Sequence, residues 1–370
     1  RVAGKPIGAV VVGGGTALNG ASQITLAGTN AGSNLSVARN LFTTADHVYI
    51  TRGKNQLEAG FWLQRIQSNS NLAQDQYGQA SFSSINNFAN GLVSTFTVIP
   101  SATELGWRSL EGAGFVQDTV HLWPNFELRA GFRFESTDGW NEAQGRASNY
   151  VFDSNGVLET QPRVANSAFT NNRARFLPEP RVGIAWQPRE NGSTVIHAGF
   201  GVYRALLDSL DYRLDQNAPF NTTQTLKNVD VSELHFTPGE PPPAGSKVSP
   251  SGIQPDVYTP TSVSYSLNVE QKLAATTSII IGYIGYHGYH QILSEDVNEP
   301  IPTPCPYAIC PGGVYYPTGA PNANPNLGAS TTWISDGVSN YNALTVDVNR
   351  HFKNGLQLRG VYTYSKSLDT

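Results

Sequence analysis

The 370-residue sequence contains little charge. Asp, Glu, Lys and Arg make up 14% of its residues, well below the quarter that is usual in soluble globular proteins. The net charge of −4 provides no basic footprint, so we expect no nucleic-acid partner. Much of the surface must therefore be polar without charge, or must not face water.

The sequence also lacks methionine and long apolar runs. We therefore expect that Arg1 is not a translation start and that the chain is a mature form or a fragment, because no signal-peptide pattern is visible. No stretch of eighteen apolar residues exists, so a transmembrane helix cannot be placed. If this chain crosses a membrane, it crosses with β-strands.

Only two cysteines are present, Cys305 and Cys310, within the Pro- and Gly-rich segment TPCPYAICPGG. Two thiols are too few for a structural zinc site, and nothing nearby supplies further ligands. The spacing favours a small loop disulfide in an oxidising compartment, and a pair of free thiols is the alternative. We expect no metal site and no cofactor.

Strict alternation of apolar and polar residues is the strongest pattern in the chain. In FELRAGFRFE, residues 126–135, every second residue is apolar, with Ala130 in the middle of the apolar face. Such a period of two indicates a strand with two different faces. The polar face carries charges of alternating sign, and we predict that it faces the lumen of a barrel: Glu127, Arg129, Arg133 and Glu135. A structural ladder of cross-strand pairs is favoured there over a catalytic pair of carboxylates.

The same pattern recurs in PRVGIAWQ, TVIHAGFGVYR, SVSYSLNVE and NALTVDVNRHF, whereas capped segments with a helical period are nearly absent. We predict that the apolar faces contact lipid. The predicted lipid-facing residues are Phe126, Leu128, Phe132, Phe134, Val182, Ile184, Trp186, Ile196, Phe200, Val263, Tyr265, Leu267, Val269, Leu344, Val346 and Val348.

Short and long connections follow one another in a regular rhythm. Five hairpins close through the short segments RGKN, LWPN, PRENGS, KLAAT and HFKNG. Long segments without a core pattern lie between them, at roughly 67–106, 136–178, 205–260 and 289–340. Compact soluble domains rarely carry several such loops, whereas outer-membrane barrels combine short periplasmic turns with long extracellular loops. The pattern predicts an all-β, antiparallel, up-and-down transmembrane β-barrel of about ten to twelve strands.

The segment TSIIIGYIGYHGYHQIL, residues 277–293, is apolar on both faces in its first half. His287 and His290 follow at its outer end, and residues three apart lie on opposite faces of a strand. We therefore interpret them as interfacial histidines rather than metal ligands. Aromatic residues such as Trp186 and Tyr203 often end the apolar faces, as expected at the level of lipid headgroups.

Several segments of the sequence resemble those of a known protein family. The strings GFVQDTVHLWPNFELRAGFRFE, PRVGIAWQPRENGSTVIHAGFGVY, YTPTSVSYSLNVEQKLAATTSIIIGYIGYHGYH and NYNALTVDVNRHFKNGLQLRGVYTYSKSLD look like successive hairpins of Oar-like TonB-dependent receptors of the acidobacterial type. RGKNQLEAGFWLQRIQSNS resembles an earlier hairpin of the same barrel. The likeness covers about residues 35–370, and five strings occur in the expected order.

The resemblance implies a receptor that takes up a large extracellular substrate with energy passed from the TonB complex. It also implies an N-terminal carboxypeptidase-regulatory-like domain, a plug and further C-terminal strands. We expect these to be absent here, so that residues 1–370 form part of one barrel domain. Outer-membrane lipid is the expected direct partner, and the TonB complex would act through the missing N-terminal parts.

We find no pattern of an enzyme. No G-x-S-x-G or H-E-x-x-H motif occurs, and the glycine clusters at 13–15 and 112–115 complete no phosphate-binding motif. A passive porin is the second hypothesis, and a secreted soluble β protein that binds glycans or acts in adhesion is the third. Strands near 7–13 and 35–43 would precede the hairpins. We expect an open, curved sheet whose first strand and last strand, ending near Lys366, do not pair with each other.

Overall fold

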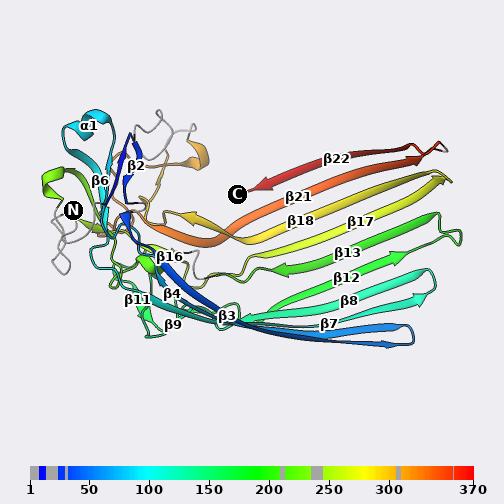
Figure 1. Ribbon diagram of the computed structural model, residues 1–370. Helices are drawn as coiled ribbons and strands as arrows, with labels where there is room; N and C mark the ends of the chain where they lie inside the picture. Colours follow the sequence, from blue (N-terminus) through cyan, green and yellow to red (C-terminus); the bar gives the residue numbers. More distant parts are fainter. Residues whose placement is uncertain are drawn as a thin grey trace.

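The computed structural model describes residues 8–13, 24–29, 32–208, 212, 214–234, 245–305, 310–352 and 354–370. Ten long strands form most of one curved antiparallel sheet (Figure 1). They are β3 (Ser36–Arg52), β4 (Asn55–Asn71), β7 (Leu105–Trp123), β8 (Phe126–Thr137), β12 (Leu177–Trp186), β13 (Thr194–Arg204), β17 (Thr261–Ala274), β18 (Thr277–Glu295), β21 (Thr331–His351) and β22 (Gln357–Asp369). The all-β, antiparallel prediction is confirmed.

Each long strand pairs with its neighbours in the sequence, so the five predicted hairpins are confirmed. The short turns all lie at one end of the strands, and the long connections gather at the other (Figure 1). The turn between β3 and β4 has only two residues, and Gly53 adopts a φ of 60° there. Glycine tolerates this left-handed conformation, which two-residue hairpins require.

The long sheet is open in the described part of the chain. β3 pairs only with β4, and β22 pairs only with β21, so these two strands are edges and do not pair with each other. The short strands β16 (Ser251–Ile253) and β9 (Asn141–Glu142) extend the sheet at its loop end. The open curved sheet that the sequence predicts is therefore confirmed.

Several strands are longer than a membrane requires. A transmembrane β-strand needs about 9–11 residues, whereas β7 has 19 and β21 has 21. The excess continues into the loop end and supports the structure there. Among the described residues no helix is long and apolar enough to span a membrane.

The long connections are not featureless, contrary to the sequence-based expectation. A six-stranded sheet at the loop end has the order β15-β14-β6-β5-β1-β2. Its strands are β1 (Ala9–Val12), β2 (Ile24–Gly28), β5 (Gln79–Phe82), β6 (Leu92–Val98), β14 (Gln224–Asp230) and β15 (Lys247–Val248). Two further pairs are β10 (Ala147–Asn149) with β11 (Arg163–Ala165), and β19 (Thr303–Pro304) with β20 (Val314–Tyr315).

The prediction that a strand near 7–13 joins the barrel is wrong. β1 pairs antiparallel with β2 and parallel with β5, both outside the long sheet. With four residues it is too short to cross a membrane, although its run of valines has a high strand propensity.

Short helices complete the loop end. Helix α1 (Ile85–Ala89) begins after Ser84, whose side chain accepts a hydrogen bond from the Asn87 backbone N–H at 3.1 Å. In the described part of the chain, the loops also contain the short 3-10 helices η4 (Leu214–Gln216), η5 (Val231–Glu233) and η6 (Pro311–Gly313).

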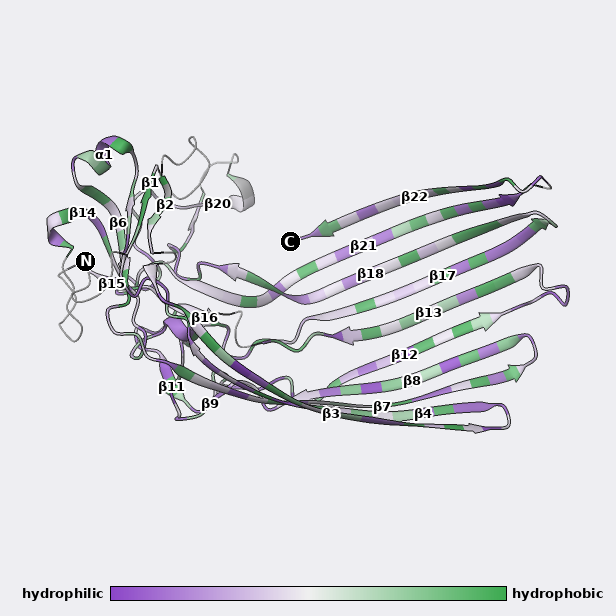
Figure 2. Cartoon of the chain, viewed as in Figure 1, coloured by the Kyte–Doolittle hydropathy of each residue, from purple (hydrophilic) through white to green (hydrophobic). Residues whose placement is uncertain are grey.

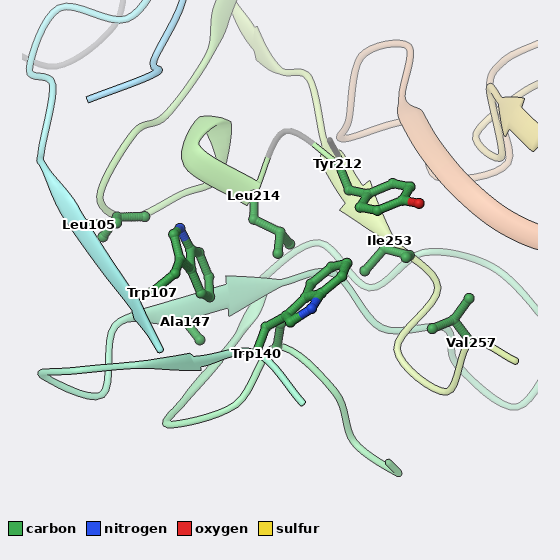
Figure 3. Packing of buried hydrophobic residues seen from close by; sticks show 9 residues of the cluster. Leu105, Trp107, Trp140, Ala147, Tyr212, Leu214, Ile253 and Val257 are labelled. Atoms are coloured by element: carbon green, nitrogen blue, oxygen red, sulfur yellow. The ribbon is translucent and has the colours of Figure 1, made fainter. Parts of the chain in front are cut away.

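The buried apolar clusters lie at the loop end. One joins β1, β5, β6 and β14 around Val12, Phe96 and Leu226. A second surrounds Trp107 and Trp140 and includes residues from several loops (Figure 3). The loops therefore fold around cores of their own, and these cores also hold the outer ends of the long strands.

Candidate functional site: the polar face and the loop end

The strand register separates an apolar face from a polar face along the long sheet. Val182 is opposite Phe200, which in turn is opposite Tyr265, and Trp186 is opposite Phe126. The same register places all sixteen predicted lipid-facing residues on one face, and the bands of alternating hydropathy are visible in Figure 2. On this face Phe132 is 41% and Leu267 is 47% exposed, so a large part of each side chain is left open in the described part of the chain.

Two carboxylates interrupt the apolar face, and the sequence analysis missed both. Asp118 is opposite Leu57 and Ala130, and Asp46 is opposite Phe61. The Asp118 carboxylate accepts a hydrogen bond from the Asn55 side chain at 2.5 Å. Both carboxylates lie in the part of their strands that is closer to the short turns.

The polar face carries a cluster of ion pairs between β8 and β12. Arg133 contacts Glu135 at 2.7 Å on its own strand and Glu179 at 3.8 Å across the strand pair. Glu179 is 1% exposed, and it also binds Arg181 at 2.6 Å. The Arg181 guanidinium lies over the Tyr203 ring, 4.4 Å from its centre. These contacts turn the predicted charged residues into a network centred on a carboxylate that the sequence analysis missed.

The other two predicted lumen residues lie apart from this network. Glu127 is 3.4 Å from His121, and Arg129 donates to the Thr119 hydroxyl at 3.2 Å. The only sequence signal for Glu179 is its position in LPEPR, between two prolines and two residues before Arg181.

A shallow hollow of about 270 Å³ lies beside this network. Its lining includes several residues with small side chains or none: Gly183, Gly199, Gly201, Ser264 and Ser266. Arg129 and Arg181 border it. This hollow therefore has a lining of small side chains with arginines at its edge. Such a surface suits contact with another polypeptide or a polar solute.

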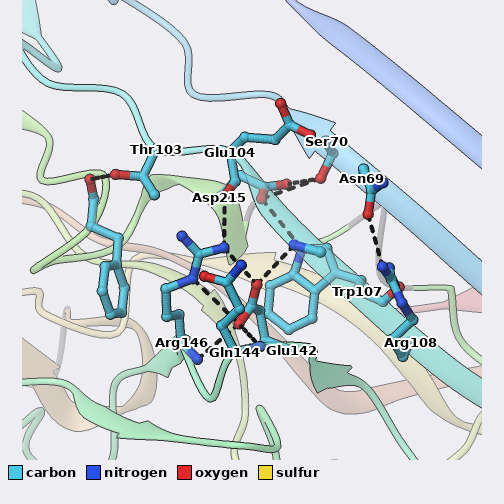
Figure 4. A network of polar contacts seen from close by, with 12 residues as sticks. Asn69, Ser70, Thr103, Glu104, Trp107, Arg108, Glu142, Gln144, Arg146 and Asp215 are labelled. Atoms are coloured by element: carbon cyan, nitrogen blue, oxygen red, sulfur yellow. Dashed lines mark hydrogen bonds and ion pairs between the residues drawn. The ribbon is translucent and has the colours of Figure 1, made fainter.

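At the loop end, Glu142 organises a chain reversal next to β7 (Figure 4). It accepts hydrogen bonds from the Arg146 side chain at 2.9 Å and from backbone N–H groups of Gly106 and Gln144 at 2.9 and 2.8 Å. Burial acts to raise the pKa of Glu142, but these donors outweigh it and hold the pKa below its ordinary value.

Asp215 is a buried carboxylate whose hydrogen-bond donors, in the described part of the chain, are uncharged. It is 3% exposed and accepts weak hydrogen bonds from the Ser70 hydroxyl at 3.3 Å and the Trp107 indole at 3.3 Å (Figure 4). Burial raises its pKa to about 6, although both donors oppose the shift. Asp215 thereby links η4 to the outer ends of β4 and β7.

A second charged contact joins two long loops. Arg173 binds Asp256 at 2.6 Å, and its guanidinium lies 4.3 Å from the centre of the Tyr258 ring. The hydrogen bond from Arg173 lowers the pKa of Asp256. His290 also stacks on the Tyr258 ring, with ring centres 4.3 Å apart.

The histidines and cysteines of the sequence analysis lie at the same end. His290 has a φ of 56° where the pairing of β18 with β21 shifts register, and His287 contacts the Asn340 side chain at 2.9 Å. In the described part of the chain, no three His, Cys, Asp or Glu residues are close enough to hold a metal ion. Cys305 and Cys310 are joined by a disulfide.

A hollow of about 920 Å³ at the loop end lies between β14, β15 and the loop that follows β18. Its lining includes Lys227, Lys247, Asp296, Glu299 and Tyr316. The Lys247 ammonium donates to the Pro325 carbonyl at 2.6 Å. Charges of both signs and an aromatic ring make this a candidate recognition surface for a polar ligand.

Long antiparallel hairpins with one uncovered apolar face, short turns at one end and folded loops at the other define an outer-membrane β-barrel protein. The family model described as "Outer membrane beta barrel domain" matches residues 4–370, so the chain belongs to that family. It is therefore a protein of the bacterial outer membrane.

Solved outer-membrane proteins match the chain at low sequence identity. The outer membrane transporter YddB from Escherichia coli matches with a TM-score of 0.49 and 13% identity over 90% of this chain and 34% of its own. The copper transporter OprC matches with 0.47 and 10%, over 90% and 39%. The siderophore receptor PirA from Acinetobacter baumannii matches with 0.45 and 9%, over 90% and 37%. The chain thus spans little more than a third of their length. No curated protein sequence matches it significantly.

Proposed function

We propose that this chain is the barrel portion of an Oar-like TonB-dependent receptor of the acidobacterial type, which imports a large substrate across the outer membrane. The five hairpin strings support the subtype, since they occur in the order expected for that family. In this proposal residues 1–370 belong to one barrel domain, and the energy-coupling parts belong to the rest of the parent protein.

The width of the sheet is the observation that carries the proposal. Ten long strands still leave β3 and β22 with one free edge each. A free edge in lipid costs several kcal/mol for every unpaired backbone group, and we infer that further strands of the parent protein pair with both edges. Barrels of 22 strands have a lumen that is too wide to be filled by their own side chains, and a plug occupies it.

The polar face supports the same conclusion. It holds the buried Glu179, the arginines around it and a floor of glycine and serine. Small side chains leave room for a second folded element in the lumen, and ion pairs provide contacts for it. We propose that a plug domain of the parent protein covers this face, that the TonB complex acts on the plug, and that the substrate arrives from the loop end.

Conductance of the full-length parent protein in planar lipid bilayers tests this proposal against a passive porin. A plugged receptor should show no steady conductance until urea displaces the plug, because the more weakly packed element is expected to unfold before the barrel. A matched protein that lacks the segment preceding Arg1 should conduct without urea. Steady conductance of the parent protein without urea would refute the proposal and favour the porin.

A further inference from the structure

The loop-end hollow, with its volume of about 920 Å³, has two unlike walls. One wall belongs to the six-stranded sheet and its flank and contributes Thr95 of β6, Thr225 and Lys227 of β14, and Ser249 just after β15. The other wall comes from the segment between β18 and β21 and includes Tyr316. Sites for small ligands usually measure about 300–1,000 Å³, so the loop-end hollow has the size of a binding site.

Two of the four charged groups in the loop-end hollow are held by the protein itself. The Lys247 ammonium donates to the Pro325 carbonyl at 2.6 Å. The Asp296 carboxylate accepts hydrogen bonds from the backbone N–H groups of Asn298 at 3.0 Å and Ser330 at 2.8 Å. Lys247 and Asp296 therefore stabilise the walls, and their charges are opposite in sign.

One cation and one anion remain for a ligand. Lys227 and Glu299 are exposed, lie on different walls, and make no side-chain hydrogen bond or ion pair with the described residues. A ligand with a net charge would therefore meet one group of its own sign. Hydroxyl groups both donate and accept hydrogen bonds, so an uncharged ligand with many hydroxyls satisfies the ammonium and the carboxylate together. The hydroxyls of Thr225 and Ser249, 3.3 Å apart, add partners of the same two-way kind.

An aromatic ring gives the loop-end hollow a flat apolar surface. Tyr316 follows directly after β20 and is 56% exposed. β20 pairs with β19, the Cys305 backbone N–H donates to the Gly313 carbonyl at 2.8 Å, and the disulfide from Cys305 to Cys310 closes the same short hairpin. This hairpin restricts where Tyr316 lies before a ligand arrives. A tyrosine ring combines an apolar face with a polar hydroxyl, which matches a sugar ring with its C–H face and hydroxyl rim.

An extended peptide suits the loop-end hollow less well than a sugar does. Such peptides commonly bind by adding a strand to a free sheet edge. β14 pairs with β6 on one side and with β15 on the other, and Val248 of β15 forms a parallel bridge with Leu327. The Gly328 backbone N–H also donates to the Val248 carbonyl at 2.8 Å. Backbone groups beside the hollow are thus occupied at these positions, so side chains must recognise the ligand.

We propose that the loop-end hollow binds an uncharged oligosaccharide, which would be the substrate class of the proposed import function. A sugar ring lies on Tyr316, and its hydroxyls bond to Lys227 on one wall and to Glu299 on the other. The inference rests on the proposed function for the uptake of the bound sugar, whereas binding itself requires only the loop end.

Isothermal titration calorimetry on the full-length parent protein tests the site, in lauryldimethylamine oxide because this detergent carries no sugar. The neutral probes are maltohexaose, cellohexaose, xylohexaose and mannohexaose. Hexagalacturonate is the anionic probe and hexaalanine is the peptide probe. We expect at least one neutral hexasaccharide to bind. Its affinity should hardly change between about 0.1 and 1 M salt, although the Debye length falls from about 10 to 3 Å, because the ligand has no net charge.

Substitutions in both walls test where the sugar lies. Tyr316→Ala should weaken binding of that hexasaccharide about tenfold, whereas Tyr316→Phe should retain it. Tyr315→Ala is the matched control, since Tyr315 is also exposed but does not line the hollow. Lys227→Gln and Glu299→Gln should each weaken binding about fivefold, because each replaces a charge-assisted hydrogen bond with a neutral one.

Binding of none of the four neutral hexasaccharides would overturn the proposal, as would equal affinities of the wild type and Tyr316→Ala. If hexagalacturonate binds more tightly, and Lys227→Gln weakens but Glu299→Gln strengthens its binding, the hollow is an anion site and the proposal fails. Tighter binding of hexaalanine would assign the hollow to a peptide and also overturn it.

The conductance experiment separates these failures from a failure of the proposed function. If the parent protein is plugged but binds no neutral hexasaccharide, only the oligosaccharide proposal fails. If a hexasaccharide binds with the expected effect of Tyr316→Ala, but the parent protein conducts steadily without urea, the sugar site stands and the energised import fails.

Discussion

A single arginine placed on each face of one strand tests the orientation of the whole sheet. We choose β17, because Leu267 and its neighbour Asn268 point to opposite faces near the middle of the strand. Leu267 is opposite Ala198 and Tyr283, whereas Asn268 is opposite His197 and Gly282. The variants Leu267→Arg and Asn268→Arg therefore differ in the face that receives the charge, but hardly in depth.

The expected cost follows from what each side chain contacts. Leu267 is 47% exposed in the chain alone, so lipid rather than protein would surround the new guanidinium. An arginine near the midplane on the lipid face costs about 2–4 kcal/mol. The Asn268 side chain lies over Gly282 on the polar face, and Glu270, which can pair with a guanidinium, lies two residues further on the same face. We expect Asn268→Arg to cost less than about 1 kcal/mol.

Urea titration of the complete parent barrel, folded reversibly into phosphatidylcholine vesicles, measures both free energies of unfolding. A difference of about 2 kcal/mol or more, with Leu267→Arg the less stable, is the expected result. Equal costs would contradict the assignment of the two faces. A larger cost for Asn268→Arg would show that the two faces are assigned the wrong way round. Arg133 is unsuitable as a control, because its guanidinium contacts both Glu135 and the buried Glu179.

Two further predictions concern the loop end. Because burial raises the pKa of Asp215 from 3.8 to about 6, its contribution to stability is full below about pH 4 and is lost as the pH rises through about 6. Asp215→Asn should therefore stabilise the loop end at pH 8 by up to roughly 3 kcal/mol and hardly at all at pH 4. Urea titration followed by tryptophan fluorescence measures both values. A difference that does not depend on pH would contradict this prediction. On intact cells, protease should cut in the long loops and spare the turns at 53–54, 124–125 and 275–276. Cleavage at those turns from outside the cell would show that the topology is the reverse of the one proposed. Mass spectrometry of the released peptides without reductant tests the disulfide between Cys305 and Cys310.

The membrane-spanning half of the fold is predictable from sequence because lipid imposes a simple rule. Every strand must alternate strictly when one face contacts lipid and the other faces a polar lumen, so FELRAGFRFE already contains the register that the structure shows. Short turns then fix which strands pair. The prediction fails where the rule does not apply, as for β1, whose four residues lie outside the long sheet, and it misses Asp46 and Asp118 on the apolar face.

Only part of the network of Arg133, Glu135 and Glu179 is predictable from the sequence, because Glu179 does not belong to an alternating pattern. Arg133 and Glu135 belong to a regular alternation, whereas Glu179 follows Pro178 and precedes Pro180 and therefore lies outside any recognisable pattern. Its role comes from register, because β12 places it directly opposite Arg133. Pairing between distant strands determines such contacts, and a single sequence does not contain that information.

The loop end is hidden from sequence analysis because buried amides, rather than an apolar period, hold much of it together. The Asn149 side chain donates to the carbonyls of Ala168 and Ile253, which belong to two different loops, at 3.0 and 2.7 Å. Asn298 in the same way donates to Gly328 at 2.8 Å and accepts from the Asn324 backbone N–H at 2.8 Å. Each amide satisfies backbone groups that would otherwise be buried without partners, and such groups cost about 1–3 kcal/mol each.

Loops that are held by buried amides can vary at their exposed, ligand-contacting positions. A loop that is held by amide-to-backbone hydrogen bonds can change its exposed residues freely, provided that a few buried asparagines keep their positions. The loop-end hollow lined by Lys227 and Glu299 is bordered by such a loop, since Asn298 is buried directly beside Glu299. The lipid-facing strands, by contrast, cannot vary without a cost in lipid. For the proposed import function, residues that select a substrate are therefore best sought among the side chains of the loop-end hollow.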